Sequence, residues 1–326
     1  MNLTNRIREC WTHVFAPATS AELITTIEWC VEQVEPQLKQ VRGYPQCFEA
    51  AVAHALAHCQ RLAQQIRAPI HVERHAYMHD PVVRALFVKA DDIPVVLSKS
   101  PPVRDWHRSQ DAPDFVALMG VRLKEKQVFS MALEGDMLRR DVAQKVVMFS
   151  DHTISALAED EPAVRTLLLR EFLDALLKHV RDRITSLRAT RQEKVQQRNE
   201  LQAQLRAKPC MQAQAHLEQC LTELNEIDAL LDLKCYADYF DAVLLKPEQY
   251  VNLLPISVSM DGIGVCYVGE NTPSSDGIHD CLELCELVGR DRRRWLVTLV
   301  KCNRHDLDAA GTYPDRLAEA GRWLAI

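Results

Sequence analysis

Residues 177–234 decide the fold, and they read LKHVRDRITSLRATRQEKVQQRNELQAQLRAKPCMQAQAHLEQCLTELNEIDALLDLK. Apolar residues recur in steps of three and four in both halves of this stretch, at Leu177, Val180, Ile184 and Leu187 and again at Leu217, Cys220, Leu224, Ile227 and Leu231. This spacing is typical of the seam of a coiled coil. Between the halves lies Pro209, which breaks a helix by its ring clash and its missing donor. We therefore predict two helices joined by a tip near 208–210.

Charge predicts how the two helices pair. Residues 178–208 carry nine basic and three acidic side chains, whereas residues 210–234 carry five acidic and one basic. Unlike arms attract and like arms repel, although each exposed ion pair contributes only about 0–1 kcal/mol. The sequence therefore favours an antiparallel hairpin within one chain over a parallel homodimer of either arm. A pair of ordinary helices packed on a core is the alternative.

The composition is that of a folded globular protein. Hydrophobic residues make up 47% and charged residues 26% of the 326 residues, which excludes global disorder and fibrous repeats. Only 10 glycines occur, which argues against glycine-rich phosphate loops, and the net charge of −6 gives no field that would recruit nucleic acid or an anionic membrane. The 11 cysteines are scattered without a disulfide framework, and neither a signal peptide nor an 18-residue apolar stretch is visible. We therefore expect a cytoplasmic protein without a membrane span.

Four consecutive regions are predicted, and together they make an α+β fold. Residues 1–69 form a helical region, with helices expected over 19–38 and 48–66 from their apolar spacing. Residues 70–160 form a mixed α/β domain, because several of its short runs rich in β-branched and aromatic residues are typical of strands, with buried helix as the alternative for runs this short; the runs lie at 84–88, 93–97, 115–119, 127–133 and 145–149. Residues 161–240 form the long antiparallel coiled-coil hairpin, and residues 241–326 form a small β-barrel-like C-terminal domain.

The C-terminal domain is predicted from five strand-like runs, at 241–245, 256–259, 263–268, 281–288 and 295–300. Around the second run, residues 254–265 read LPISVSMDGIGV. Ser259 and Gly262 match the Asp/Asn-x-Ser-x-x-Gly motif of PilZ domains, and Ser257 stands where that family has an acid or an amide. Residues 250–302 therefore resemble a PilZ domain, a small bacterial β-barrel that binds cyclic di-GMP.

This resemblance implies an alternative function, a second-messenger receptor or a regulatory protein that binds a partner through a degenerate domain. The implied nucleotide ligands are Ser257, Ser259 and Gly262. A basic cluster in the later turn could clamp a phosphate, namely Arg290, Arg292, Arg293 and Arg294. The Arg-x-x-x-Arg signature that precedes the motif in the family is missing here. The basic cluster is also typical of a solvated turn, and it could grip a nucleic acid backbone.

Histidines at four-residue spacing suggest a metal site. His54 and His58 lie four apart in the second predicted helix, and His75 and His79 repeat the spacing. Two imidazoles on one helix face can bind a divalent metal. No carboxylate completes a His-Glu-x-x-His pattern, so a water-activating base is not evident. If these histidines bind a metal, the protein could be a metal-dependent enzyme. The alternative is that they are polar side chains on the surface of a helix and a loop.

No catalytic residues are predicted. Ser150-Asp151-His152 contains the residue types of a triad, but a triad is assembled in space and neighbours in sequence rarely converge. The chain contains no Walker loop, no Gly-x-Ser-x-Gly elbow and no Gly-x-Gly-x-x-Gly fingerprint. We therefore expect a scaffold or adaptor whose residues 165–235 contact a protein partner or a second copy of the chain.

Overall fold

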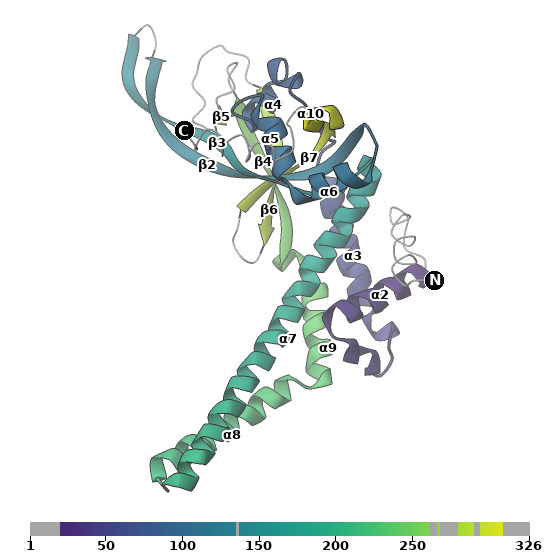
Figure 1. The fold of residues 1–326 in the computed structure, drawn as a ribbon, viewed down its shortest axis with the longest axis vertical. Helices are drawn as coiled ribbons and strands as arrows, with labels where there is room; N and C mark the ends of the chain where they lie inside the picture. The colour runs from purple at the N-terminus through teal and green to yellow at the C-terminus, as the bar shows by residue number, and fades with distance from the viewer. Residues whose placement is uncertain (1–19, 135–136, 261–265, 268–279, 290–293, 309–326) are drawn as a thin grey trace, which may run out of the picture. The chain divides into compact units, whose positions relative to one another are not determined.

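The computed structural model describes residues 20–134, 137–260, 266–267, 280–289 and 294–308 (Figure 1). Within these ranges the chain is a mixed α+β protein, as the sequence predicts. Contacts between residues divide the chain into two units. The first combines residues 1–60 with 170–251, and the second combines 61–169 with 252–326. Each unit thus joins stretches that lie far apart in sequence.

Helices build the first unit. They are α2 (Ser20–Val34), α3 (Glu49–Gln65), α7 (Glu161–Ala207), α8 (Met211–Leu230), α9 (Leu233–Leu244) and the 3-10 turns η1 (Pro36–Gln40), η2 (Gln46–Phe48) and η4 (Pro247–Gln249), and of these α3 and α7 also contribute to the second unit. In the core, Phe48 and Phe240 lie edge to face with their ring centroids 4.9 Å apart. Ile27, Val52 and Leu177 are fully buried. The apolar faces predicted from the sequence therefore meet in one helical core.

Proline sets where the first helix ends. The helix predicted over 19–38 stops at Val34, and a 3-10 turn starts at Pro36, because proline lacks the N–H that would continue the helix. The second predicted helix, over 48–66, is confirmed as α3, preceded by the short turn η2.

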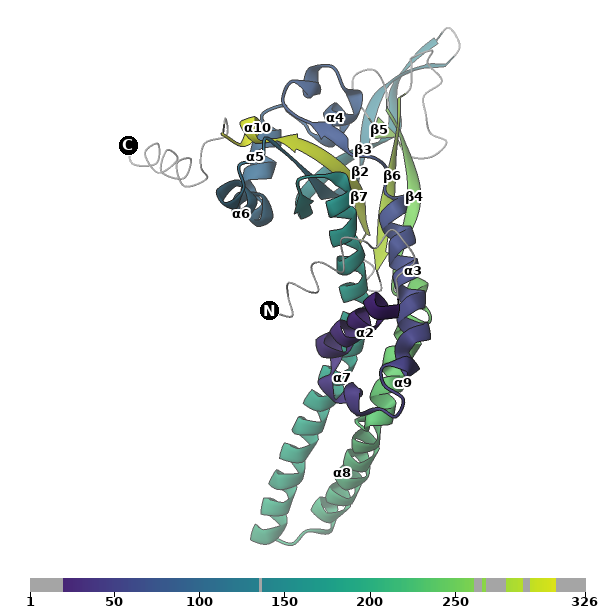
Figure 2. The ribbon, with the colours of Figure 1, turned by 90° about the vertical axis from the view of Figure 1, so that its right-hand side faces the viewer.

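α7 and α8 form the predicted antiparallel hairpin (Figure 2). α7 ends at Ala207, residues 208–210 form the connection, and α8 begins at Met211. Figure 2 shows α8 running back alongside α7. The predicted tip near 208–210 is therefore confirmed, and it coincides with Pro209.

A buried carboxylate ties this hairpin to the N-terminal helices. Glu35, which follows α2, is only 6% exposed, and its Oε1 accepts a hydrogen bond from the N–H of Gln37 at 3.4 Å. Arg188 on α7 donates a charged hydrogen bond to Oε2 of Glu35. The same guanidinium donates to the Tyr236 hydroxyl on α9 at 3.4 Å. One arginine thus connects three helical segments of the first unit.

One sheet organises the second unit. Its strands are β1 (Ile70–Val72), β2 (Asp114–Glu134), β3 (Met137–Ala158), β4 (Val251–Met260), β5 (Cys266–Tyr267), β6 (Asp280–Gly289) and β7 (Arg294–Asn303), in the order β1-β7-β2-β3-β5-β4-β6 with β6 also paired to β7. β1 runs parallel to β7, whereas β2 pairs antiparallel with both β3 and β7. The long β2–β3 pair contains the predicted strands 115–119, 127–133 and 145–149.

Short helices pack against one face of this sheet. They are η3 (Ala76–Met78), α4 (Pro81–Leu86), α5 (Asp92–Lys99), α6 (Pro101–Ser109) and α10 (Arg304–Asp308). Phe115 and Met119 of β2 point into the core that these helices share with the sheet, together with Phe87 and Leu97. The rings of Trp106 and Phe115 lie 4.9 Å apart. Among the described residues, apolar side chains from strands and helices of this unit therefore share a core.

Three runs that the sequence analysis assigned to strands are helical, and those predictions are wrong. Residues 84–88 overlap α4, which begins because Oδ1 of Asp80 accepts the N–H of Val82 at 2.8 Å and caps it. Residues 93–97 lie in α5, and residues 241–244 end α9. In α5, for example, Ile93 and Leu97 are buried and lie four residues apart on one helix face. Runs of five residues do not distinguish such a helix face from a strand.

The predicted C-terminal barrel is also corrected. β4, β6 and β7 do not form a small separate barrel, because they belong to the same sheet as β2 and β3. β7 pairs with β2 from Asp114 opposite Asn303 to Val121 opposite Leu296. Among the described strands, β5 has two residues and meets β3 at one register position, Val147 opposite Cys266. The strands predicted for a separate C-terminal barrel are therefore part of one larger sheet.

The Glu35–Arg188 contact yields a stability prediction. We expect Arg188→Met to lower the free energy of unfolding by about 1–3 kcal/mol, because it leaves the buried Glu35 carboxylate without its cation. Lys178→Met is the matched control, since Lys178 is an exposed cation on the same helix. Urea unfolding followed by circular dichroism measures both variants. Equal effects from the two substitutions would contradict the assignment.

Candidate functional site

The predicted histidines do not gather into a metal cluster in the described part of the chain. His58 is buried, and its Nε2 lies 2.8 Å from the carbonyl oxygen of Val251, whereas His54 is exposed on α3. His75 and His79 are exposed beside η3, with their ring centroids 5.2 Å apart. No group of three His, Cys, Asp or Glu side chains among the described residues could hold a metal ion. Metal binding here stays a prediction.

The residues of the PilZ-like motif are only partly described. Ser257 and Ser259 lie on β4 on either side of the buried Val258, so they share the face of the strand that turns away from the core. Gly262, Arg290, Arg292 and Arg293 lie outside the described residues. Arg294 begins β7 opposite Val288. The nucleotide site inferred from the resemblance therefore also stays a prediction.

Ser150, Asp151 and His152 lie on β3 and turn to different partners. Oδ2 of Asp151 lies 3.3 Å from Nζ of Lys124. Nε2 of His152 lies 2.7 Å from the carbonyl oxygen of Leu86, and its ring stacks on Phe87. Burial of the ring lowers the pKa of His152. These contacts anchor α4 to the sheet and give the stretch a structural role.

The distal hairpin, which we define as residues 185–231, buries little of its own apolar surface. All of these residues are described, and the buried side chains among them are Cys220 and Leu224. Leu221 on α8 is 39% exposed, and so is Leu230. Other apolar residues predicted for the seam, or lying next to it in sequence, are only half-buried: Leu187, Leu201, Leu205, Leu217 and Ile227. Two helices alone therefore leave this stretch with an incomplete core.

Ion pairs cross the distal hairpin and fix its register. Nζ of Lys194 on α7 lies 2.6 Å from Oε2 of Glu223 on α8. This contact raises the pKa of Lys194 and lowers the pKa of Glu223. Arg191 pairs with Asp228 one turn further from the tip. The predicted attraction between the basic and the acidic arm thus comes from specific ion pairs. The sequence showed how many charges each arm carries, but not which side chains pair.

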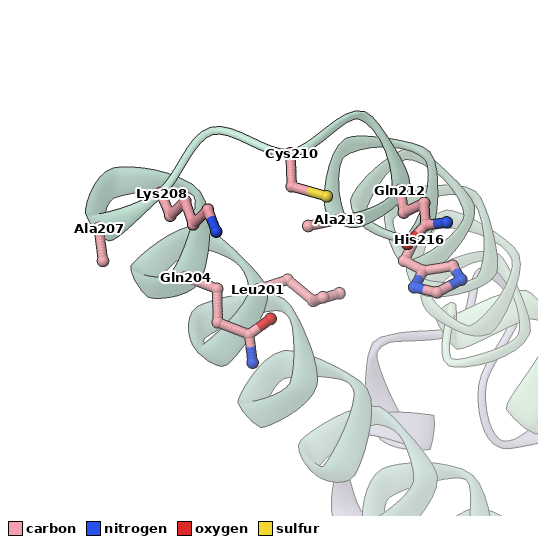
Figure 3. Close-up of a pocket in the computed structure, with 8 residues that line it drawn as sticks. All are labelled: Leu201, Gln204, Ala207, Lys208, Cys210, Gln212, Ala213 and His216. Atoms are coloured by element: carbon pink, nitrogen blue, oxygen red, sulfur yellow. The ribbon is translucent and has the colours of Figure 1, made fainter.

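A hollow of about 450 Å³ lies between the two helices at the tip (Figure 3). Its lining comes from both helices and their connection: Leu201, Gln204, Ala207, Lys208, Cys210, Gln212, Ala213 and His216. Figure 3 shows Leu201 reaching from α7 toward α8. Met211 beside the hollow is 87% exposed. The seam therefore opens toward solvent where the hairpin turns.

Cys210 is an exposed thiol at the start of α8. The N–H groups of Ala213 and Gln212 lower the pKa of this thiol by stabilising its thiolate. By contrast, partial burial and then the charge of Asp241 raise the pKa of Cys47, which is also exposed. The sequence analysis did not single out Cys210. A cysteine between a proline and an amphipathic helix is the signal that could have found it.

Comparison with protein-family models, curated proteins and solved structures returned no match. Within the residues that the structure describes, none of the helices combines the length and the apolar character needed to span a bilayer. The distal hairpin combines a fixed register with incompletely buried apolar residues.

The register of the hairpin can be tested by exchanging charges. We expect Lys194→Glu to speed thermolysin cleavage within residues 195–222, because two carboxylates then face each other across the helices. Lys194→Glu combined with Glu223→Lys should restore the wild-type rate. High salt should reduce the difference between the variants, since it screens exposed charges.

Gln192→Glu serves as the control for added negative charge, because Gln192 is exposed on the same helix. It should leave the cleavage rate close to that of the wild type. If the double charge exchange is cleaved as fast as Lys194→Glu alone, the Lys194–Glu223 pair does not set the register.

Cys210 and Cys47 provide a matched pair for a pH experiment. A lowered pKa gives more thiolate at a given pH, and the thiolate is the form that reacts with iodoacetamide. We therefore expect alkylation of Cys210 to be faster than that of Cys47 near neutral pH. As the pH is raised, the alkylation rate of Cys210 should begin to increase at a lower pH than the rate of Cys47. Peptide mass spectrometry across a pH series measures both sites in one sample. A lower midpoint for Cys47 would contradict the assigned pKa directions.

Proposed function

We propose that this chain is a scaffold or adaptor protein that uses its distal hairpin, as a coiled-coil element, to contact another protein surface. The observation that carries the proposal is the burial pattern of residues 185–231. Cys220 and Leu224 are buried there, while Leu221 and Leu230 are each 39% exposed and Met211 is 87% exposed. Removing this apolar surface from water would favour association by about 25 cal/mol per Å².

The ion pairs across the hairpin support the same function. Lys194 with Glu223, and Arg191 with Asp228, hold α7 and α8 in one register before any partner arrives. A surface that is ordered in advance loses less conformational freedom on binding. The hairpin therefore suits recognition better than a loosely paired element of the same composition.

The base of the hairpin supports a mechanical role as well. Arg188 joins Glu35 and Tyr236, so that α7 is fixed to both α2 and α9 in the first unit. Ile184 and Val180, just before this point, are buried in the helical core. The distal part extends from an anchored base, which is what a contact element needs in order to keep a bound partner in a defined position.

Removal of the distal hairpin tests the proposal. We expect deletion of residues 192–227, bridged by a short Gly-Ser linker, to leave a folded protein, because the deleted stretch contributes only Cys220 and Leu224 to the buried residues. The deletion retains Arg188 and Tyr236. The variant should lose its associations, measured as mass by light scattering and as partners recovered from a lysate.

The matched control keeps the length of the hairpin. Gln192→Glu changes an exposed residue on the same arm and should keep both mass and partners. A deletion variant that is folded by circular dichroism and keeps the mass and the partners of the wild type would overturn the proposed function.

A further inference from the structure

We propose that the surface bound by the distal hairpin is the distal hairpin of a second copy of this chain, so that two hairpins form a four-helix bundle. This inference rests on the proposed function and names its partner. The structural juxtaposition behind it is a basic helix lying beside an acidic helix, with apolar residues left incompletely covered along both.

The charges of the distal hairpin make it complementary to itself. From residue 190 to 208, α7 and the turn carry five basic and two acidic side chains. From residue 211 to 230, α8 carries four acidic side chains and no Lys or Arg. If α7 of one copy faces α8 of the other, the two-fold symmetry that makes one basic–acidic contact also makes the second. Both helices of both copies then have an oppositely charged neighbour, and the assembly closes as a dimer.

Charged side chains that form no ion pair within the described part of one chain can supply the contacts between two copies. The pairs of Lys194 with Glu223 and Arg191 with Asp228 use part of each arm. Within the part of the chain that the structure describes, Arg198 and Arg206 on α7 and Glu218 and Glu226 on α8 have no ion-pair partner. Arg198 is the next seam position of α7 after Lys194, and in a four-helix bundle the seam positions of all helices face the common interior.

Arg198 and Glu218 also lie at similar distances from the turn of the hairpin. Arg198 lies eleven residues before Pro209, and Glu218 lies nine residues after it. At about 1.5 Å per residue, the two lie about 16 and 14 Å from the turn. With both tips pointing the same way, Arg198 of one copy would stand level with Glu218 of the other.

The available area is sufficient for a stable dimer. α8 has 20 residues, which makes it about 30 Å long at 1.5 Å per residue. A face two helices wide is about 20 Å across, since a helix with its side chains is about 10 Å in diameter. Each copy would bury about 600 Å², and the dimer about 1,200 Å², which exceeds the roughly 1,000 Å² expected of a specific interface. Leu221 would lie within it, whereas Leu230, nine residues or two and a half turns further along α8, lies on the other side of that helix.

Charge reversal on one arm at a time provides the test. The first variant, Arg198→Glu with Arg206→Glu, makes both arms acidic. The second, Glu218→Lys with Glu226→Lys, places two cations on α8 and brings its net charge from −4 to zero, because Glu223 and Asp228 remain. Each variant should dissociate more readily than the wild type by about tenfold or more, because like charges then face each other across the dimer. An equimolar mixture of the two should form a heterodimer of wild-type strength, since positions 198 and 218 then carry opposite charges at both contacts between the copies.

Sedimentation equilibrium over a concentration series measures these dissociation constants in the full-length protein. Circular dichroism checks that each variant keeps its helices, and recovery in the mixture shows that a weakened variant is still folded. Leu221→Asn tests the apolar part independently: Leu221 is 39% exposed in the single chain, so its loss should weaken the dimer without unfolding the hairpin.

Three results would overturn the inference: a wild-type chain that stays monomeric at every concentration, single-arm variants that dimerise as well as the wild type, or a mixture no stronger than its components. These results are distinguishable from failure of the proposed function. A monomeric wild type that loses other protein partners when residues 192–227 are deleted would overturn self-association while leaving the contact role of the hairpin intact.

Discussion

The hairpin of α7 and α8 depends on the attraction between two helices of opposite charge, which are joined by a turn at Pro209. Pro209 interrupts what would otherwise be one long helix, and the chain can then turn back on itself. Direction and register follow from charge, because Lys194 and Arg191 find Glu223 and Asp228 on the returning helix. Exposed ion pairs add little stability one by one. Their role here is to select one pairing among several that apolar spacing alone would permit.

The seam of the hairpin shows how this selection is built. Steps of three and four residues from Leu187 lead to Arg191, Lys194 and Arg198 before apolar residues return at Leu201. The middle of α7 therefore presents cations where a coiled coil would place leucine. Such polar layers specify register at some cost in stability. The half-buried leucines on either side of this layer are consistent with that cost, and they leave apolar surface for association.

The hairpin could be predicted because its signals are local. A proline, a repeat of three and four and a change of charge all lie within residues 177–234. The sheet could be predicted only in part, because β7 pairs with β2 across more than 170 residues, as in Asp114 opposite Asn303. The runs at 84–88 and 93–97 were misassigned because about five residues do not distinguish a buried helix from a strand, and only the first of the two helices has a side-chain cap, Asp80, that could have identified it. The charge balance of the two arms is a local signal and could be found in the sequence. The ion pair of Arg188 with Glu35 joins residues 153 positions apart, so only the folded structure shows it.

The pairing of a basic helix with an acidic helix, which folds the hairpin, also restricts the charge pattern of any partner that would contact both helices. Residues 190–230 carry nearly balanced charge, with five basic and six acidic side chains. A partner with a uniformly charged surface would therefore be attracted by one arm and repelled by the other. A partner whose charge changes sign from one helix to the next satisfies both arms, and a second copy of this hairpin has that pattern by construction. The proposed self-association would use this charge pattern together with the apolar residues that the hairpin leaves exposed, such as Leu221.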